Sequence, residues 1–179
     1  MGKLTIRSAE NSDVRPLARL HVDAWKVAYA PILKQKHLDW ISVDREVRRK
    51  RSGIKDGTPF IVAEDISGLV GFMVYSRCTD EEAEAPGAID IDSYWVHHQR
   101  TREGIGGALL RDMIRRTSPK RIYAWVLTGV KAGPAFYEKN GFRPLEETRQ
   151  DFIFLGDPMP MVRYMKTVRK RPATARKKK

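Results

Sequence analysis

Apolar residues recur along the chain with two different periods, and the alternation predicts an α/β fold. Short runs rich in β-branched and apolar residues predict strands at 4–7, 59–64, 69–76, 88–96, 121–127, 142–146, 152–155 and 161–167. Apolar residues spaced three or four apart predict helices at 14–29, 32–38, 43–54, 104–116 and 132–140. This order predicts a mixed sheet with helices on both faces.

Residues that favour turns and helix ends mark the boundaries of these elements. Asn11, Ser12 and Asp13 are N-cap candidates for the first helix, which Pro31 ends. Gly68 supplies the turn of a hairpin, and Gly141 supplies the cap of the last helix. The predicted inner face of the first helix carries Leu17, Leu20, Ala24 and either Val27 or Ala28.

The composition is that of one globular domain. The 179 residues are 41% hydrophobic and 9% aromatic, which suffices for a core without disulfides. The single cysteine, Cys78, cannot pair within the chain, and no apolar run approaches the roughly 18 residues that span a bilayer. These features predict a soluble, cytoplasmic protein with no membrane span.

The net charge of +12 is concentrated at the C-terminus. Residues 166–179 contain eight Lys or Arg and no acid. A domain over 1–168 and a basic disordered tail over 169–179 are therefore expected. The tail is either simply solvated or makes a weak contact with nucleic acid, a ribosome or an anionic membrane surface.

A glycine-rich turn leads from the strand at 88–96 into an apolar helix. Gly104, Gly106 and Gly107 allow close approach of a ligand to the backbone, and a helix N-terminus offers unpaired N–H groups to an anion. This pattern predicts a pyrophosphate site, although such glycines also let a helix pack closely on a sheet. It lacks the Gly-Lys-Ser/Thr ending of a Walker loop, and it lies too late in the chain for a dinucleotide fold.

Three segments together resemble the GNAT superfamily of acetyl-CoA-dependent N-acetyltransferases. The segment 94–106 resembles the family's strand and pyrophosphate loop, and 135–142 (AFYEKNGF) resembles its second signature. The segment 21–31 is similar to the opening helices of a bacterial small-molecule branch. The resemblance covers almost all of 4–168 and implies a single domain with a mostly antiparallel mixed sheet.

The resemblance also implies which residues bind acetyl-CoA. Thr101 stands where relatives carry Gln or Arg, Arg102 replaces a common glycine, and Val130 replaces a common Asn. Backbone contacts to the phosphates survive these changes, and Arg102 can add a charged one. The residues expected to contact the cofactor are Trp95, Val96, Thr101, Arg102, Gly104, Ile105, Gly106, Gly107, Ala108 and Tyr137.

Acetyl transfer to an amine requires a proton acceptor and a proton donor. Asp90 and Asp92 are two apart on one strand, so they share a face, and either can accept the proton of the amine; a base elsewhere, or water, remains open. The resemblance implies that Tyr137 protonates the leaving thiolate, and packing against the cofactor is the alternative role. A strand N–H near Val96 would polarise the carbonyl.

The acceptor itself is less defined. Trp25 and Tyr29, four apart on one helix, form either core or a wall of the acceptor site. The acidic segment 80–84, with Asp90 and Asp92, favours a cationic small-molecule amine, or is only a solubilising loop. A protein N-terminus or lysine, and a non-catalytic acetyl-CoA-binding module tethered by its tail, are alternatives, and a homodimer is left open.

No metal site is expected from the histidines. His97 and His98 are adjacent, so their rings are expected to point apart, and His21 and His37 are remote.

Overall fold

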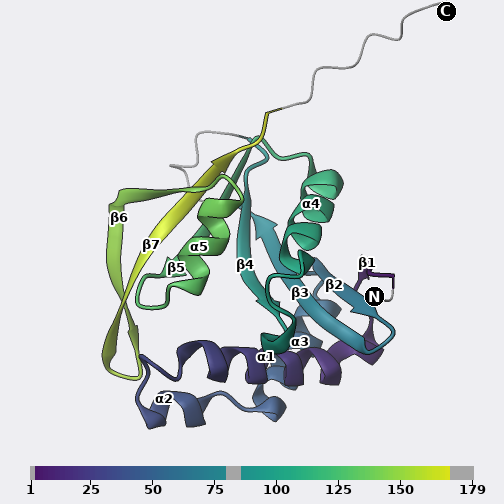
Figure 1. Ribbon diagram of the computed structural model, residues 1–179, viewed down its shortest axis with the longest axis horizontal. Coiled ribbons are helices and arrows are strands. Elements are labelled where there is room, and N and C mark those ends of the chain that lie inside the picture. Colours follow the sequence, from purple (N-terminus) through teal and green to yellow (C-terminus); the bar gives the residue numbers. More distant parts are fainter. Residues whose placement is uncertain (1–2, 80–85, 170–179) are drawn as a thin grey trace, which may run out of the picture.

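The computed structural model of the protein describes residues 3–79 and 86–169, which form one seven-stranded sheet with the order β1-β2-β3-β4-β5-β7-β6 (Figure 1). Every neighbouring pair of strands is antiparallel except β4 and β5, which are parallel. The predicted mixed, mostly antiparallel sheet is confirmed. Its strands are β1 (Thr5–Ser8), β2 (Phe60–Asp65), β3 (Gly68–Arg77), β4 (Ile89–Val96), β5 (Arg121–Leu127), β6 (Arg143–Phe154) and β7 (Asp157–Thr167).

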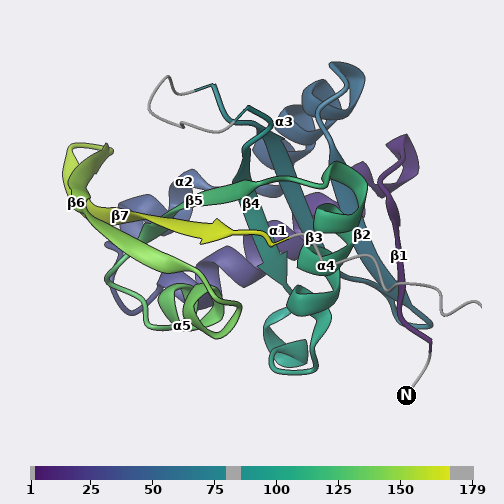
Figure 2. The same ribbon diagram turned by 90° about the horizontal axis from the view of Figure 1, so that it is seen from above.

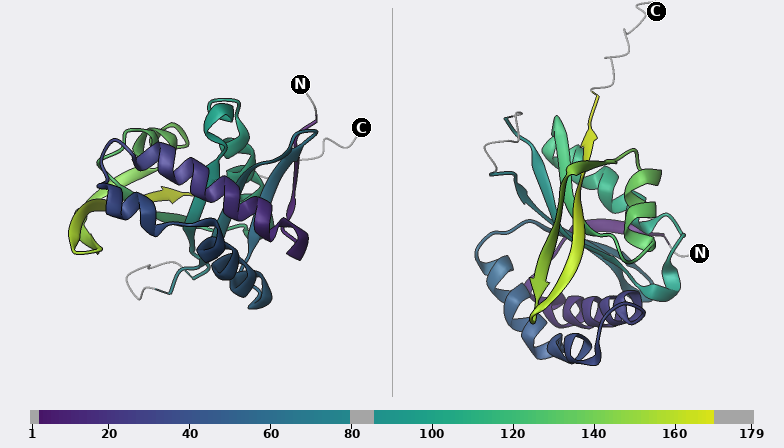
Figure 3. Two further views of the ribbon diagram at one scale, coloured as in Figure 1. Left: turned by 90° about the horizontal axis from the view of Figure 1, so that it is seen from below. Right: turned by 90° about the vertical axis from the view of Figure 1, so that its left-hand side faces the viewer.

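Helices cover both faces of this sheet, as predicted. The helices of the described residues are α1 (Val14–Tyr29), α2 (Gln35–Trp40), α3 (Val43–Lys55), α4 (Ile105–Thr117) and α5 (Ala132–Lys139), with 3-10 turns at Asn11–Asp13 and His98–Arg100. The helices α4 and α5 pack on one face, and α1 packs on the other with α3 against it (Figure 3). No helix in these ranges is long and apolar enough to cross a membrane. The cytoplasmic location stays a prediction.

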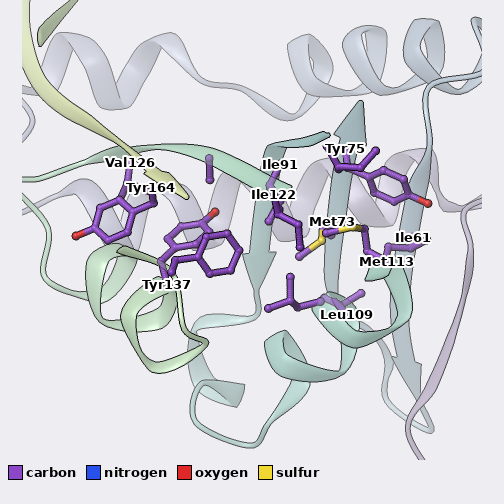
Figure 4. Close-up of a cluster of buried hydrophobic side chains, with 14 of the residues drawn as sticks. Ile61, Met73, Tyr75, Ile91, Leu109, Met113, Ile122, Val126, Tyr137 and Tyr164 are labelled. Carbon is purple, nitrogen blue, oxygen red and sulfur yellow. The ribbon is translucent and has the colours of Figure 1, made fainter. Parts of the chain in front are cut away.

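The two faces bury separate apolar clusters. The larger lies between the sheet and the pair α4 and α5, and Figure 4 shows its side chains, including Tyr137 and Leu109. The smaller joins Leu17 and Leu20 of α1 to Phe72 of β3. The predicted inner face of α1 is therefore confirmed for the two leucines and for Ala24, which is also buried, while Val27 is exposed and Ala28 half-buried.

Two turn predictions are confirmed by backbone angles, and a cap prediction is refined. Gly68 and Gly141 adopt φ of 102° and 80°, the left-handed region that glycine tolerates best. Asp13 precedes α1 but makes no cap bond from its side chain. Its carboxylate instead accepts hydrogen bonds from the Glu10 N–H and from Arg7, because the 3-10 turn at 11–13 points it backwards.

Two elements differ from the sequence prediction. The helix predicted at 32–38 is found at Gln35–Trp40, because residues after Pro31 form a turn before α2 begins. The two strands predicted at 142–146 and 152–155 are one strand, β6, which pairs with β7 on both sides of an irregularity between Leu145 and Gln150. That irregularity interrupts the apolar alternation, which made one strand look like two. Figure 2 shows the β6–β7 hairpin extending away from the rest of the sheet.

Candidate active site

The parallel strands β4 and β5 separate soon after they pair. They are paired only at Ile89 with Ile122 and at Asp90 with Tyr123, and Figure 4 shows the two strands diverging beyond that point. On its other edge β4 has a bulge, because Ser93 pairs with Val74 and Ile91 pairs with Tyr75, which leaves Asp92 as the extra residue. A bulge bends and twists the strand that carries it, so this one helps to turn β4 away from β5.

Three tyrosines from three elements meet near this separation. Tyr137 of α5 is buried, and burial raises the pKa of its hydroxyl well above 10, with a further contribution from nearby Tyr94 and Tyr29. None of the three hydroxyl groups has a hydrogen-bond partner among the described residues. None of these hydroxyl oxygens is among the fully buried atoms that lack a partner in the described ranges, so all three remain free to hydrogen-bond a ligand at this place.

The N-terminus of α4 opens beside the separation. Gly104 has φ of 83°, and the first helical hydrogen bond runs from the Ala108 N–H to the Gly104 carbonyl over 3.0 Å. The preceding N–H groups of α4 therefore have no partner within the helix. The guanidinium of Arg111 lies beside Gly107, whose added Cβ would be 3.2 Å from its Nη1. This is the arrangement that a pyrophosphate requires.

Arg100 fixes the loop that precedes α4. Its guanidinium donates hydrogen bonds to Glu103, 2.7 Å away, and to Asp65 at the β2–β3 turn, 2.8 Å away. Thr101 and Arg102 lie exposed in this loop, and Arg102 has φ of 68°, which is unusual for a residue other than glycine. Sequence reasoning missed Arg100, because its partner Asp65 lies 35 positions away and its bond to nearby Glu103 depends on how the loop folds.

Gly106 serves packing as well as ligand approach. A Cβ added there would lie 1.9 Å from the Tyr94 Oη and 2.9 Å from the Phe136 ring. The rings of Tyr94 and Phe136 stack at 4.2 Å, so the pair lies directly against the first turn of α4. Both interpretations of the glycines therefore apply: Gly106 permits close packing, and the helix end still offers its N–H groups.

The two candidate aspartates have different partners. Asp90 accepts a hydrogen bond of 3.1 Å from the Nη2 of Arg163, a buried residue of β7. Asp92 accepts one of 3.0 Å from the Ser76 hydroxyl and has no ion pair among the described residues. Asp92 is exposed, yet partial desolvation raises the pKa of its carboxyl, and the charge of Asp90 adds to the rise.

Trp25 and Tyr29 share one face of α1, as predicted, and belong to a group of four half-buried aromatic residues. We call Trp25, Tyr29, Trp95 and Phe154 the aromatic wall. Its ring centroids lie 5.1 Å apart for Trp25 and Tyr29, 5.7 Å for Tyr29 and Trp95, and 6.2 Å for Trp25 and Phe154. The Trp95 ring therefore faces α1. Only the main chain of Trp95 is then in position to contact a cofactor in the gap between β4 and β5.

A buried polar cluster that sequence reasoning missed lies behind Trp95. The His21 Nδ1 is 2.7 Å from a Glu46 carboxylate oxygen, and the Lys50 ammonium is 3.3 Å from the same oxygen. Burial lowers the pKa of His21 to about 4, so its ring is neutral at pH 7. Its Nδ1 contacts both the Glu46 carboxylate and the Lys50 ammonium, which is 3.3 Å away. The His21 ring then lies 5.2 Å from that of Trp95. The one sequence signal for this cluster is the spacing of Glu46 and Lys50, which lie one helical turn apart in an amphipathic helix.

The rings of His97 and His98 do not point apart but stack at 4.7 Å, because the chain turns into a 3-10 helix at His98. Among the described residues, no group of three or more His, Cys, Asp or Glu could hold a metal ion. The acidic segment 80–84 lies outside the described residues.

These features fit acetyl-CoA. Its pyrophosphate matches the open N–H groups of α4 and the nearby Arg111, and its thioester offers polar atoms to the unpartnered tyrosine hydroxyls. Val96 lies at the end of β4, between the N-terminus of α4 and the tyrosine hydroxyls. Its side chain packs with the apolar cluster under α4.

Comparison with known proteins agrees with this assignment. Residues 56–144 match the family model of the acetyltransferase (GNAT) domain. The uncharacterized N-acetyltransferase YuaI of Bacillus subtilis is 20% identical over 156 residues, which cover 86% of this chain and 87% of YuaI. The probable N-acetyltransferase Rv2775 of Mycobacterium tuberculosis is 25% identical over 142 residues, covering 78% and 79% of the two chains.

The fold is also shared with solved structures. The PaiA N-acetyltransferase of Thermoplasma acidophilum, solved in complex with coenzyme A, superposes with a TM-score of 0.67 and is 19% identical. The match covers 93% of this chain and 99% of PaiA. The separated strands, the open helix end and the matching family model lead to one conclusion: the chain belongs to the GNAT family of N-acetyltransferases, which take their acetyl group from acetyl-CoA.

Proposed function

We propose that the protein acetylates a primary amine of a small cationic molecule, by direct attack of the amine on the donor, with Asp92 as the proton acceptor and Tyr137 as the proton donor. The observation that carries this proposal is the buried Tyr137 side chain beside the gap between β4 and β5, whose hydroxyl has no hydrogen-bond partner among the described residues. Acetyl-CoA, when bound, supplies the thioester carbonyl that the amine attacks.

Asp92 is the better placed of the two aspartates. An alkylammonium with a pKa near 10.4 must lose a proton before it can attack. Asp92 is exposed to an incoming amine, and its raised pKa makes it a stronger base than an ordinary carboxylate. Asp90 is held by Arg163, and a proton on Asp90 would weaken that ion pair. We therefore assign Asp90 to positioning Arg163 and Asp92 to binding and deprotonating the ammonium.

Tyr137 supplies the proton that the departing sulfur needs. Burial raises the pKa of its hydroxyl, so the group stays protonated across the physiological range, as a proton donor must. Burial also disfavours a free thiolate at the same place, so the sulfur gains affinity for this proton. Asp92 accepts one proton of the ammonium and then releases it to solvent. As the C–N bond forms and the C–S bond breaks, the hydroxyl proton of Tyr137 passes to the sulfur, and the second proton lost by the nitrogen restores the Tyr137 hydroxyl.

The main chain of β4 completes the site. Backbone N–H groups on the edge of β4 that faces the gap, near Val96, would hold the carbonyl oxygen as negative charge develops on it. The bulge at Asp92 breaks the regular pairing of β4 just before this stretch. The cofactor contacts assigned to the loop, from Thr101 to Ala108, are consistent with the open end of α4.

The test is release of thiol from acetyl-CoA with a panel of primary amines, using the full chain and a chain that ends at residue 168. Turnover on a small amine by both forms supports the proposal. Turnover only on peptides and only with residues 169–179 present would replace it with protein acetylation. Binding of acetyl-CoA without turnover on any amine would leave a non-catalytic binding module.

A further inference from the structure

The aromatic wall is not needed for the transfer chemistry, yet it leads away from the reaction centre. Its inner end is Tyr29, whose ring lies 5.7 Å from that of Trp95 on β4, the strand that carries Asp92. Beside Tyr29 stands Trp95, whose indole N–H donates a hydrogen bond of 3.1 Å to the Ser93 hydroxyl, next in the chain to Asp92. The wall therefore begins where the amine must react.

The outer end of the wall is open to solvent. Phe154, at the tip of the β6–β7 hairpin, contacts Trp25 and also the Trp40 ring of α2, 5.1 Å away. Trp40 is 36% exposed, and Phe152, two residues before Phe154 on the same strand, is 52% exposed. Exposed aromatic residues that continue a half-buried aromatic group are more typical of a binding surface than of a core.

The wall is held in place before any ligand arrives. The Trp95 ring rests on His21, which Glu46 fixes through a 2.7 Å contact beneath it. On the outer side, the His37 ring stacks on Phe154 at 5.2 Å and contacts Asp157 of the hairpin at 3.0 Å. Rings fixed by buried neighbours lose little entropy on binding, which favours a flat apolar group as their ligand.

The charges around the outer end exclude a second positive charge on that ligand. Lys34 and Lys36 of this region both bind Asp157, and the Arg45 guanidinium lies 3.8 Å from the centre of the Trp40 ring. Near the inner end Asp92 has no cationic partner among the described residues. One ammonium at Asp92 is favoured, and another at the far end would meet like charges.

We propose that the aromatic wall binds the acceptor and that the acceptor is an arylalkylamine, a primary amine joined by a short chain to an aromatic ring. This inference rests on the proposed function and specifies its substrate class. The ammonium lies at Asp92, and the aromatic ring lies against Trp25, Tyr29 and Phe154.

The first experiment compares kcat/KM for 2-phenylethylamine, n-butylamine and spermidine in the thiol-release assay. Contact of a phenyl ring with the wall predicts a preference of about tenfold for 2-phenylethylamine over n-butylamine, with spermidine the poorest. Equal or better turnover of n-butylamine or spermidine overturns the inference while the proposed function stands.

Variants of the hairpin make the test specific to the wall. Phe154→Ala should lower the ratio of kcat/KM for 2-phenylethylamine to kcat/KM for n-butylamine about tenfold. Ile153→Ala is the matched control, because Ile153 is the neighbouring residue on β6, is 61% exposed and belongs to no ring contact. Trp25→Ala is the second wall variant. Equal losses with both amines in Phe154→Ala and Trp25→Ala would overturn the inference.

A binding measurement separates failure of the inference from failure of the proposed function. Trp25 and Trp95 belong to the wall and Trp40 touches it, so intrinsic tryptophan fluorescence reports on this region. With acetyl-CoA replaced by coenzyme A, 2-phenylethylamine should change the fluorescence saturably, and Phe154→Ala, which keeps every tryptophan, should weaken that binding about tenfold. Absence of a saturable change in the unmodified protein overturns the inference, whether or not any amine is acetylated.

Discussion

Arg163 of β7 donates a hydrogen bond of 3.1 Å to Asp90 of β4, across the intervening strand β5. The guanidinium also lies over the Tyr123 ring of β5, 4.3 Å from its centre, and the arginine is buried. A buried guanidinium requires an ionised partner, so Asp90 has a structural task. Asp90 and Asp92 are equivalent candidates in the sequence, because they lie two residues apart on one strand. Their roles differ because the tertiary structure places different partners beside them.

Asp92→Asn is expected to lower kcat about 100-fold, because the amide cannot accept the amine proton. In the unmodified protein kcat/KM should rise with pH as Asp92 loses its proton, and the raised pKa of Asp92 places this rise above the ordinary carboxyl range. Rates measured against pH with 2-phenylethylamine and n-butylamine check both points. We call this rise of kcat/KM with pH the acid limb of the rate profile. If Asp92→Asn retains the acid limb, Asp92 is not the proton acceptor.

Asp90→Asn is the matched substitution and should act on stability instead. It removes the charged partner that β4 supplies to the buried Arg163, so the unfolding free energy should fall by more than it does in Asp92→Asn. The acid limb of the rate profile should remain. Thermal unfolding alongside the rate profile distinguishes the two variants, and loss of the limb in Asp90→Asn alone would exchange the assigned roles.

Tyr137→Phe should reduce kcat about 100-fold with little change in the Kd of coenzyme A, since only the hydroxyl is lost. Tyr164→Phe is the control: its ring lies in the same cluster, 5.8 Å from that of Tyr137, but its hydroxyl is bonded to Glu138 over 3.0 Å. We expect that variant to keep its turnover. Equal turnover of Tyr137→Phe and the unmodified protein would leave Tyr137 with a packing role only.

Gly106→Ala and Gly107→Ala should differ, although the two glycines are adjacent. The Cβ at Gly106 would overlap the Tyr94 and Phe136 rings, and relieving that overlap is expected to cost about 1–3 kcal/mol. At Gly107 the nearest atom is the mobile end of Arg111, at 3.2 Å, which can move aside. Thermal unfolding and coenzyme A binding of both variants check this, and equal tolerance at the two positions would contradict the packing described for Tyr94.

His21 should make the fold sensitive to mild acid. Its pKa is about 4 in the folded protein and near 6.5 in the unfolded chain, so the unfolded chain binds more protons between those values. The unfolding free energy should therefore fall as the pH decreases from 7 to 5, by about 2 kcal/mol from this group. His21→Gln should remove that part of the slope, whereas His97→Gln, outside the cluster, should keep it. Denaturant unfolding at several pH values measures the slope, and an unchanged slope in His21→Gln would contradict the burial of a neutral ring.

The amino-acid sequence by itself determined the fold class and the acetyl donor. Apolar periodicity located the strands and helices, and the turn at Gly104 with the run from Ala135 to Phe142 identified the family. These features could be predicted because they are local: a period, a cap or a glycine turn depends on neighbours within one or two turns of chain. The boundaries of α2 and β6 were wrong for the same reason, since a turn and a strand irregularity alter the local pattern.

Only the tertiary structure decided which residues act together at the site. Arg163 lies 73 positions from Asp90, and Glu46 lies 25 positions from His21, so no local pattern connects either pair. The aromatic wall draws on α1, β4 and β6, whose rings meet only after the sheet forms and α1 packs across it. Burial and neighbours distant in the chain decide which carboxylate pairs with Arg163 and which is left for the acceptor. They also decide which surface an acceptor can contact.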